Sequence, residues 1–357
     1  MHRKNNFDAL RLLAATSVIF GHAHPLTKSP DLALLGSSVQ AIAVKVFFVI
    51  SGYLIYSSWN LQPSLLPYLQ KRALRIFPAL AVLCVLTVFI AGPLITDIPV
   101  HTYFGYPHTY YYFVNLLLKP IYDLPGLFQF NPYPVAVNGS LWSLPVEFTM
   151  YLTLPLVCWI QRRAKSHSVF VLFTLGLCWV SLWYTRVHQP AQHPVFYGTD
   201  LISLLDVAPY FFVGALIRDL DLEEFLNPVV GLFLVIAVAL IQPTGRISSE
   251  IALYVLVPYV TLAVALNANS LLSGVGKYGD FSYGVYLYGF LCQQIVERLA
   301  HGQLGPWSNA LLSLPPALLL AMLSWHFVEK PMLALKPRNS LSRKPDVQLI
   351  EPANETP

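Results

Sequence analysis

Charged residues are scarce in this sequence. Asp, Glu, Lys and Arg make up 11% of the 357 residues, whereas hydrophobic residues make up 55%. A soluble globular domain carries about 25% charged residues. The shortage therefore excludes an ordinary soluble protein and indicates an integral membrane protein with many spans. The net charge of +4 is too small to indicate nucleic-acid binding, and we expect none.

Cysteine is scarce as well. The four cysteines lie in apolar segments without a CxxC spacing: Cys84, Cys158, Cys178 and Cys292. They exclude a disulfide framework and a clustered metal site, and we expect no metal and no permanently bound cofactor. The sequence also shows no cleavable signal peptide, no internal repeat of the transporter type and no soluble catalytic domain.

What the sequence has instead is a series of long apolar runs. Each run is long enough to cross about 30 Å of hydrocarbon, a few of them with tilt or flanking residues. We predict an all-α, polytopic protein with about ten transmembrane helices, near 7–26, 41–59, 78–96, 144–160, 169–185, 201–217, 228–241, 251–266, 281–299 and 309–327. Residues 1–335 would form the transmembrane domain, and residues 336–357 a polar, disordered cytoplasmic tail.

The distribution of basic residues predicts the orientation. Loops on one side would hold fifteen Lys and Arg residues and loops on the other side five, while Arg11 and Lys45 lie inside helices. This asymmetry places both termini in the cytoplasm. On the outer side, residues 97–143 form a long connection dense in tyrosine and proline. Its apolar stretch 110–118 is too short to span and is interpreted as interfacial or re-entrant.

The first apolar run contains two ionisable residues whose burial in a membrane costs free energy. They are Arg11 and His22, eleven positions apart. On a helix this spacing returns them to nearly the same face, about 16 Å apart along the axis. Ionisable residues inside a membrane helix are functional by default. Arg11 would lie near the cytoplasmic surface, within reach of Asp8, and His22 in the outer half. The alternatives are a snorkelling anchor for Arg11 and a structurally satisfied core imidazole for His22.

The fourth predicted helix carries Glu147 inside its apolar span. The helix would run from outside to inside, so Glu147 would lie in the outer half, at the depth of His22. A carboxylate beside an imidazole raises its basicity, as in a general base with an orienting partner. The alternative is a structural hydrogen bond between helices.

Further cations lie near the second helix. Lys45 in its outer part would snorkel outward or stabilise negative charge on a reacting carbonyl. Arg72 and Arg75, in the inner connection that follows, are three residues apart and face the same way. With Arg11 they would form a cytoplasmic cluster suited to phosphates, or else contact lipid headgroups.

Six motifs occur along nearly the whole chain. They are Arg11 and His22 with ten residues between them, Phe47-Phe48-Val-Ile-Ser51-Gly52-Tyr53, Arg72-x-x-Arg75-Ile-x-Pro78, Gly139-Ser140-Leu-Trp142-Ser143-Leu-Pro-Val-Glu147, Phe281-Ser282-Tyr283-Gly284-Val-Tyr286-Leu-Tyr288 and Ser324-Trp-His-Phe-Val-Glu329-Lys330-Pro331. With these motifs, in this order, the chain resembles the membrane acyltransferase 3 family of bacterial O-acyltransferases. Many members of that family carry a second histidine where this sequence has Gly289.

The resemblance implies acyl transfer from a cytoplasmic acyl-CoA, most simply acetyl-CoA, to a hydroxyl of an exported or lipid-linked glycan at the bacterial inner membrane. We expect His22 and Glu147 to be catalytic and Arg11, Arg72 and Arg75 to bind the donor. The supporting or substrate-binding residues would be Asp8, Lys45, Asn138, Ser140, Trp142, Ser143 and Tyr286. His22 would act as the base or carry the acyl group transiently, and the tyrosine-rich outer segment would stack on sugar rings.

Two other classes of protein fit parts of the pattern. A transporter or flippase for a lipid-linked glycan would use intramembrane Arg, His and Glu as a proton relay. A structural partner in a polysaccharide export complex is the third class. The lack of repeats and the arginine cluster favour the enzyme.

Overall fold

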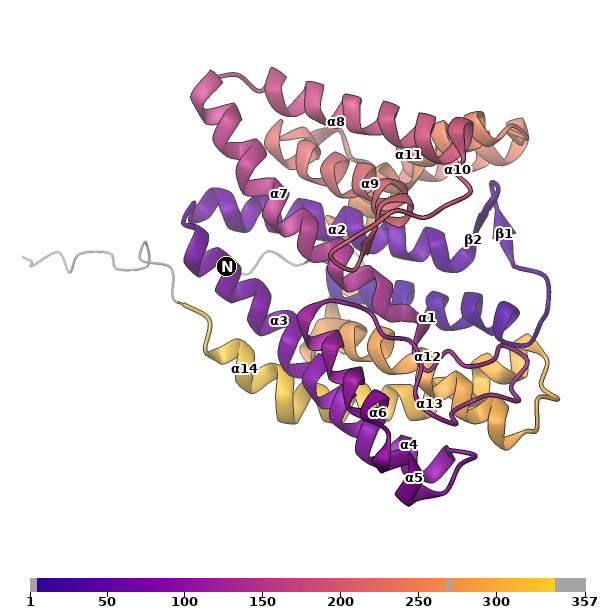
Figure 1. Ribbon diagram of the computed structural model, residues 1–357. Coiled ribbons are helices and arrows are strands. Elements are labelled where there is room, and N and C mark those ends of the chain that lie inside the picture. The colour runs from indigo at the N-terminus through magenta and orange to yellow at the C-terminus, as the bar shows by residue number, and fades with distance from the viewer. Residues whose placement is uncertain (1–4, 268–270, 338–357) are drawn as a thin grey trace, which may run out of the picture.

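The computed structural model describes residues 5–267 and 271–337, and over these residues the fold is almost entirely helical (Figure 1). The only strands in this part of the chain form two short antiparallel hairpins, β1 (Ala33–Leu34) with β2 (Ser37–Ser38) and β3 (Val195–Phe196) with β4 (Thr199–Asp200). The predicted tail lies outside the described residues apart from Lys336 and Pro337.

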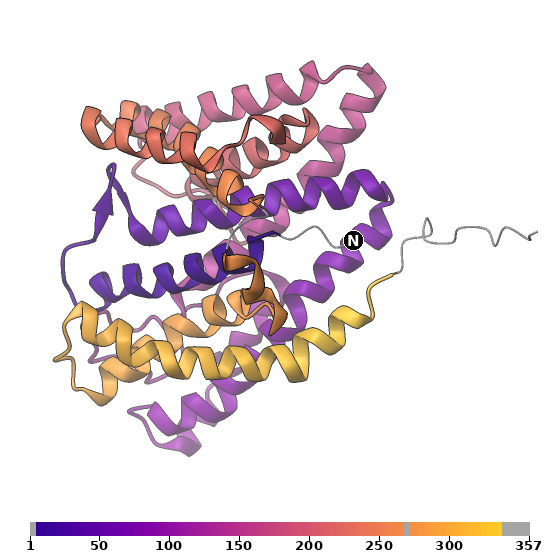
Figure 2. The same cartoon turned by 180° about the vertical axis from the view of Figure 1, so that it is seen from behind.

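A helix is present at each of the ten predicted positions. The helices are α1 (Phe7–Leu26), α2 (Val39–Leu61), α3 (Leu65–Leu86), α7 (Ser143–Ala164), α8 (Ser168–Leu182), α9 (Leu201–Asp219), α10 (Pro228–Ile241), α11 (Arg246–Ala265), α12 (Ser282–Leu299) and α13 (Pro306–Ser324). Three continue through wider turns: α3 through η1 (Thr87–Ala91) and α4 (Gly92–Ile95), α8 through η4 (Trp183–His188), and α13 through η7 (Trp325–Glu329) and α14 (Lys330–Ala334). The last of these runs crosses the whole bundle (Figure 2).

The third helix begins thirteen residues before its predicted start at 78. Pro78 was the first residue of the predicted range 78–96. Instead Pro78 lies inside α3, which membrane helices tolerate when neighbouring groups satisfy the freed backbone. Arg72 and Arg75 therefore lie within a spanning helix and not in a connection.

Seven helices in the described ranges are long and apolar enough to cross a membrane. The others of the predicted ten are α10, which has 14 residues, and the more polar α1 and α12. Since α1 packs against α2, α12 and α13, its polar side chains face protein. Large apolar side chains such as Leu172, Trp179 and Phe233 are exposed on the outer helices, as expected of a surface that faces lipid.

The helices alternate in direction, so their connections gather at two ends of the bundle. One of them, which we call the basic end, lies where α14 ends in Figure 1. The residues at or near it include Lys71, Arg162, Lys165, Arg218 and Lys336. The hairpin β1–β2 and the connection between α12 and α13 lie at the opposite end.

The long connection before α7 turns back into the bundle. It first forms α5 (Val100–Gly105), α6 (Pro107–Tyr111) and η2 (Tyr112–Leu117), in which Tyr103 and Tyr112 are fully buried. It ends in η3 (Gly139–Trp142), where Asn138, Ser140 and Leu141 are buried. The fourth predicted helix thus begins inside the protein and not at its surface.

Close helix packing fixes the centre of the bundle. A Cβ atom on Gly52 of α2 would lie 1.8 Å from the carbonyl oxygen of Phe211 of α9, and one on Gly214 would lie 2.3 Å from the carbonyl oxygen of Val49. Only glycine allows this approach, which is typical of helix pairs in membranes. The α2–α9 pair is the frame against which the other helices are placed.

Candidate functional site

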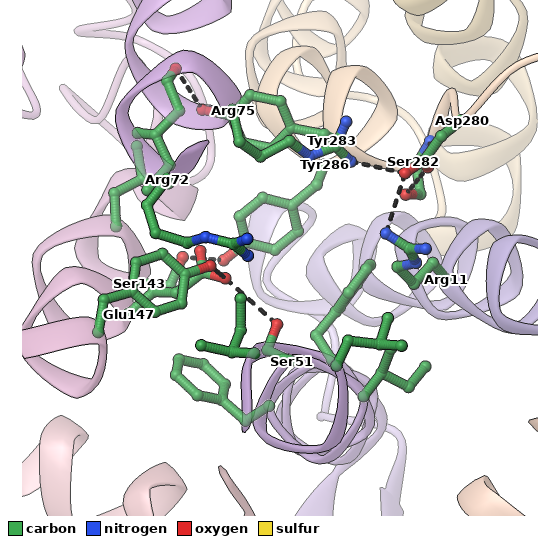
Figure 3. A pocket seen from close by; sticks show the side chains of 18 of the residues that line it. Arg11, Ser51, Arg72, Arg75, Ser143, Glu147, Asp280, Ser282, Tyr283 and Tyr286 are labelled. Atoms are coloured by element: carbon green, nitrogen blue, oxygen red, sulfur yellow. Dashed lines mark hydrogen bonds and ion pairs between the residues drawn. The ribbon is translucent and has the colours of Figure 1, made fainter. Parts of the chain in front are cut away.

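A cavity of about 420 Å³ lies between α1, α2, α3, α7 and α12. Figure 3 shows its lining side chains, with Glu147 and Ser51 on one side and Arg11 and Asp280 on the other. Five basic and three acidic residues line it: Arg11, Lys71, Arg72, Arg75 and Lys336, and Asp8, Glu147 and Asp280. Toward α2 its wall is apolar. The cavity therefore joins a net positive region to an apolar one.

Arg11 and Arg75 are held together by one carboxylate. Asp280, just before α12, lies 3.0 Å from Arg11 and 2.7 Å from Arg75. Arg11 also pairs with Asp8 at 2.8 Å, as predicted, and Arg75 with Glu329 at 3.4 Å. The predicted clustering of Arg11 with the Arg72/Arg75 motif is thus present, and two of its three members are already paired with carboxylates.

Arg72 differs from the other two arginines. Its guanidinium lies over the rings of Tyr68 and Tyr151, 5.7 and 5.9 Å from their centroids, and its Nη2 donates to Ser58 at 3.4 Å. Its Nε is buried without a hydrogen-bond partner, and it forms no ion pair within the described part of the chain. Arg72 therefore has hydrogen-bond donors available to an anion in the cavity.

Glu147 lies on the cavity wall. Its carboxylate accepts hydrogen bonds from Tyr151 and, at 3.3 Å, from Ser51 of α2. One helical turn earlier, Ser143 and Tyr286 share a hydrogen bond of 2.7 Å. Glu147 thus belongs to the wall that α2 and α7 form around the cavity.

The predicted pairing of Glu147 with His22 is wrong. The His22 ring packs edge-on against Phe290 of α12, 5.4 Å between centroids, and its buried Nδ1 has no hydrogen-bond partner in the residues described. His22 is not among the residues that line the cavity. Glu147 lines the cavity, and its hydrogen-bond partners are Ser51 and Tyr151.

Glu147 and His22 lie at different depths in the bundle. Ser51 lies ten residues from the end of α2, and Arg75 ten residues from the start of α3, so both are about 15 Å from the basic end. Glu147 shares their level, because the re-entering connection starts α7 inside the bundle. Arg11 shares it through Asp280, so Arg11 is recessed and not near the surface as expected. His22 lies about 16 Å further along α1.

The cavity nevertheless reaches close to the level of His22. Gly21 packs directly against Gln40 of α2, which sets the register between the two helices. Val44, the lining residue of α2 nearest the opposite end, is one helical turn, about 6 Å, closer to the basic end than Gln40. Phe47 and Tyr286, whose ring centroids are 5.8 Å apart, also line this inner end.

Lys45 does not lie in the cavity, and it does not snorkel outward. It is fully buried, 3.3 Å from Asp206 and 3.4 Å from Glu250. Arg186 pairs with the same two carboxylates, each at 2.6 Å. A charge buried so deeply requires such partners, so Lys45 ties α2 to α9 and α11.

The predicted supporting residues before Glu147 have structural contacts. Asn138 donates to the carbonyl of Leu287 at 2.8 Å and accepts from the amide of Ser140 at 3.1 Å. The carbonyl of Ser140 accepts from Ser143 and Tyr286, both at 3.2 Å, and Trp142 is half-buried. Together they build the turn that places Glu147 at mid-depth.

Several lining residues were missed from the sequence: Lys71, Tyr151, Asp280 and Lys336. Asp280 immediately precedes a recognised motif, and Glu329, which pairs with Arg75, lies inside another. Position in a motif was the signal available, and it does not say which carboxylate faces which arginine.

Gly289 packs against Ile19, because a Cβ atom on Gly289 would lie 2.8 Å from Ile19 Cγ1. A side chain at position 289 would therefore meet Ile19.

The fold and the cavity define a polytopic membrane protein with a basic cavity that opens on an apolar interior. Residues 4–326 match the family described as "Acyltransferase domain". The chain belongs to this acyltransferase 3 family. It is a multi-pass membrane protein and an acyltransferase enzyme.

Curated relatives agree over nearly the full length. The chain is 32% identical over 341 residues to an O-acetyl transferase of Shigella phage Sf6, covering 93% of this chain and 97% of the relative. It is 30% identical to nodulation protein 10 of Rhizobium leguminosarum, covering 95% of each. It is 25% identical to the peptidoglycan O-acetyltransferase OatA of Listeria monocytogenes, covering 92% of this chain and 55% of that protein. No solved structure matches the chain.

Proposed function

We propose that this protein transfers an acetyl group from acetyl-CoA, bound from the cytoplasm, to a hydroxyl of a cell-surface or lipid-linked polysaccharide at the bacterial inner membrane. The observation that carries the proposal is the cavity, with a basic mouth and an apolar inner end about one helical turn from the level of His22. An acyl-CoA has the matching form, with phosphates at one end and an uncharged arm that ends in the thioester.

The donor would enter at the basic end. Arg72, which lacks a carboxylate partner in the described ranges, would bind a donor phosphate through its free donors. Arg11 and Arg75 would present positive charge deeper in the cavity while Asp280 holds their positions. The arm would then extend past Ser51 and Glu147 toward Val44 and Phe47.

The acceptor would approach from the opposite end, where His22 lies. In the proposed step the acceptor hydroxyl oxygen attacks the thioester carbon, the new C–O bond forms and the C–S bond breaks. His22 takes the hydroxyl proton as general base and passes it to the leaving CoA thiolate. Phe47 and Tyr286 stand at the inner end of the cavity, so their side chains must move to let the thioester reach this point.

Glu147 takes a different role from an orienting partner of His22. Its hydrogen bonds to Tyr151 and Ser51, on the wall beside Arg72, suit it to position the donor arm and to balance the charge of the arginines. The proposed site thus divides into a donor side, around Arg72 and Glu147, and an acceptor side, around His22.

The test measures transfer of labelled acetyl from acetyl-CoA, in membranes that contain the protein, to base-labile ester in the polysaccharide fraction. Transfer should occur with the wild type and be lost in Arg72→Ala. Arg163→Ala is the matched control, because Arg163 is an exposed arginine of the same end that does not line the cavity. If the glycan carried no label and its transport across the membrane depended on the protein, the result would support a flippase instead.

A further inference from the structure

The cations of the cavity fall into two groups. Arg11 and Arg75 are paired with Asp8, Asp280 and Glu329. Arg72 and Lys336 form no ion pair with any described residue. The paired cations are recessed by about 15 Å, whereas Lys336 follows the end of the helix run Pro306–Ala334. The unpaired charge is thus concentrated toward the mouth.

Lys336 is held in this position by its helix. It follows α14, which packs against α3, and its backbone amide donates to the carbonyl of Leu333 at 3.3 Å. Leu333 and Lys336 both line the cavity, and Lys336 is half-buried. These contacts fix the backbone of Lys336 beside the cavity.

The surroundings of Lys336 are positively charged. Burial lowers the pKa of its ammonium group to about 8, together with the charges of Arg72, Arg75, Lys71 and Arg11. A lysine placed among cations without a carboxylate destabilises the empty protein. A ligand with several negative charges relieves this repulsion, so the mouth is suited to a polyanion.

We propose that Lys336 binds the ribose 3′-phosphate of the CoA donor and is a determinant of donor specificity. This inference rests on the proposed function. The thioester must reach the inner end near Val44, and the pyrophosphate must follow the arm within reach of Arg72. In CoA the 3′-phosphate is on the nucleotide, at the other end of the molecule from the thioester. Among the cations that line the cavity, Lys336 is the one that lies beyond the end of the spanning helix before it.

The experiment compares kcat/KM for acetyl-CoA and for 3′-dephospho-acetyl-CoA in the purified, lipid-reconstituted protein. A charge-assisted phosphate contact predicts that the wild type prefers acetyl-CoA by about tenfold or more. In Lys336→Met the preference should fall toward one, through a higher KM for acetyl-CoA at unchanged kcat. Lys336→Arg should keep most of the preference, because the positive charge remains.

Lys330→Met is the matched control, since Lys330 is an exposed lysine of the same helix that does not line the cavity. It should retain the wild-type preference. Unchanged use of the dephospho donor by Lys336→Met would show that this variant is folded. An equal preference in Lys336→Met and the wild type, or no preference in the wild type, would overturn the inference alone. Absence of acetyl transfer from either donor in the wild type would overturn the proposed function as well.

Discussion

Arg11 and His22 belong to one sequence motif but have different surroundings in the structure. Arg11 is in an ion-pair network with Asp8 and Asp280. His22 has a buried Nδ1 without a hydrogen-bond partner among the described residues. Removing the imidazole would therefore break no hydrogen bond of this atom. We expect the loss of His22 to affect the proposed chemistry more than the stability of the fold.

His22→Ala should lower kcat/KM by about 10²–10⁴-fold, the usual loss when a general base is removed. Unfolding in detergent should be little changed, because no hydrogen bond of Nδ1 is lost. The effects of His22→Ala and Glu147→Gln on the free energy of unfolding should add within about 0.5 kcal/mol, since the two share no partner. Glu147→Gln and Tyr151→Phe share a hydrogen bond and should not add. Wild-type activity in His22→Ala would refute the assignment.

The charge state of Lys336 gives a pH prediction. A lysine binds phosphate in its protonated form, and the lowered pKa of about 8 means that this form is lost as the pH rises through 8, not through the ordinary value near 10.5. The KM for acetyl-CoA should therefore rise between about pH 7.5 and 9. Steady-state kinetics should show a flatter profile in Lys336→Arg, whose guanidinium stays charged. A profile identical in both proteins would contradict the prediction.

At the scale of elements, the sequence predicted the helices well and the connections poorly. The run 201–217 matches the observed α9, Leu201–Asp219, because a long apolar stretch specifies a membrane helix locally. The start of α3 was predicted thirteen residues too late, at Pro78, which lies inside the observed helix. The re-entry of residues 118–142 depends on buried contacts such as Asn131 to Gln294 at 2.8 Å, which no local pattern announces.

The α2–α9 contact gives a prediction at this scale. Gly52→Ala should lower the unfolding temperature and reduce activity, because the new Cβ would lie 1.8 Å from the carbonyl oxygen of Phe211. Gly176→Ala in α8 is the control, since a Cβ there meets no atom within 4 Å, and it should leave stability unchanged or raise it slightly. Equal unfolding temperatures for the two variants, measured by thermal unfolding in detergent, would refute the close approach.

At the scale of the whole molecule, charge asymmetry and structure agree on two distinct ends. The basic end contains the mouth of the cavity, with Lys71 and Lys336. The positive-inside rule predicts that this end faces the cytoplasm, where the proposed donor would meet the cavity directly. The connection before α7 exposes Tyr106, Tyr110, Tyr111 and Tyr133, which we expect to stack on sugar rings.

This orientation can be tested with single cysteines and a membrane-impermeant maleimide. Arg246→Cys, at the opposite end, should be labelled in intact spheroplasts. Lys165→Cys, exposed at the basic end, should be labelled after the membrane is opened. The unmodified protein, whose own cysteines are buried or half-buried, serves as the control. Labelling of Lys165→Cys in intact spheroplasts would reverse the orientation.

The sequence by itself determined the class of protein, the positions of the helices and the residues worth attention. These follow from composition, apolar runs and ordered motifs, which are local properties of the chain. Tertiary structure decided the partners: Asp280 for Arg11 and Arg75, Ser51 and Tyr151 for Glu147, Asp206 and Glu250 for Lys45. Depth and rotation of a helix depend on where its connection enters the bundle and on how tightly distant helices pack, as at Gly52 and Phe211. His22, about 16 Å along α1 from Arg11, therefore shares a motif with Arg11 but does not line the same cavity.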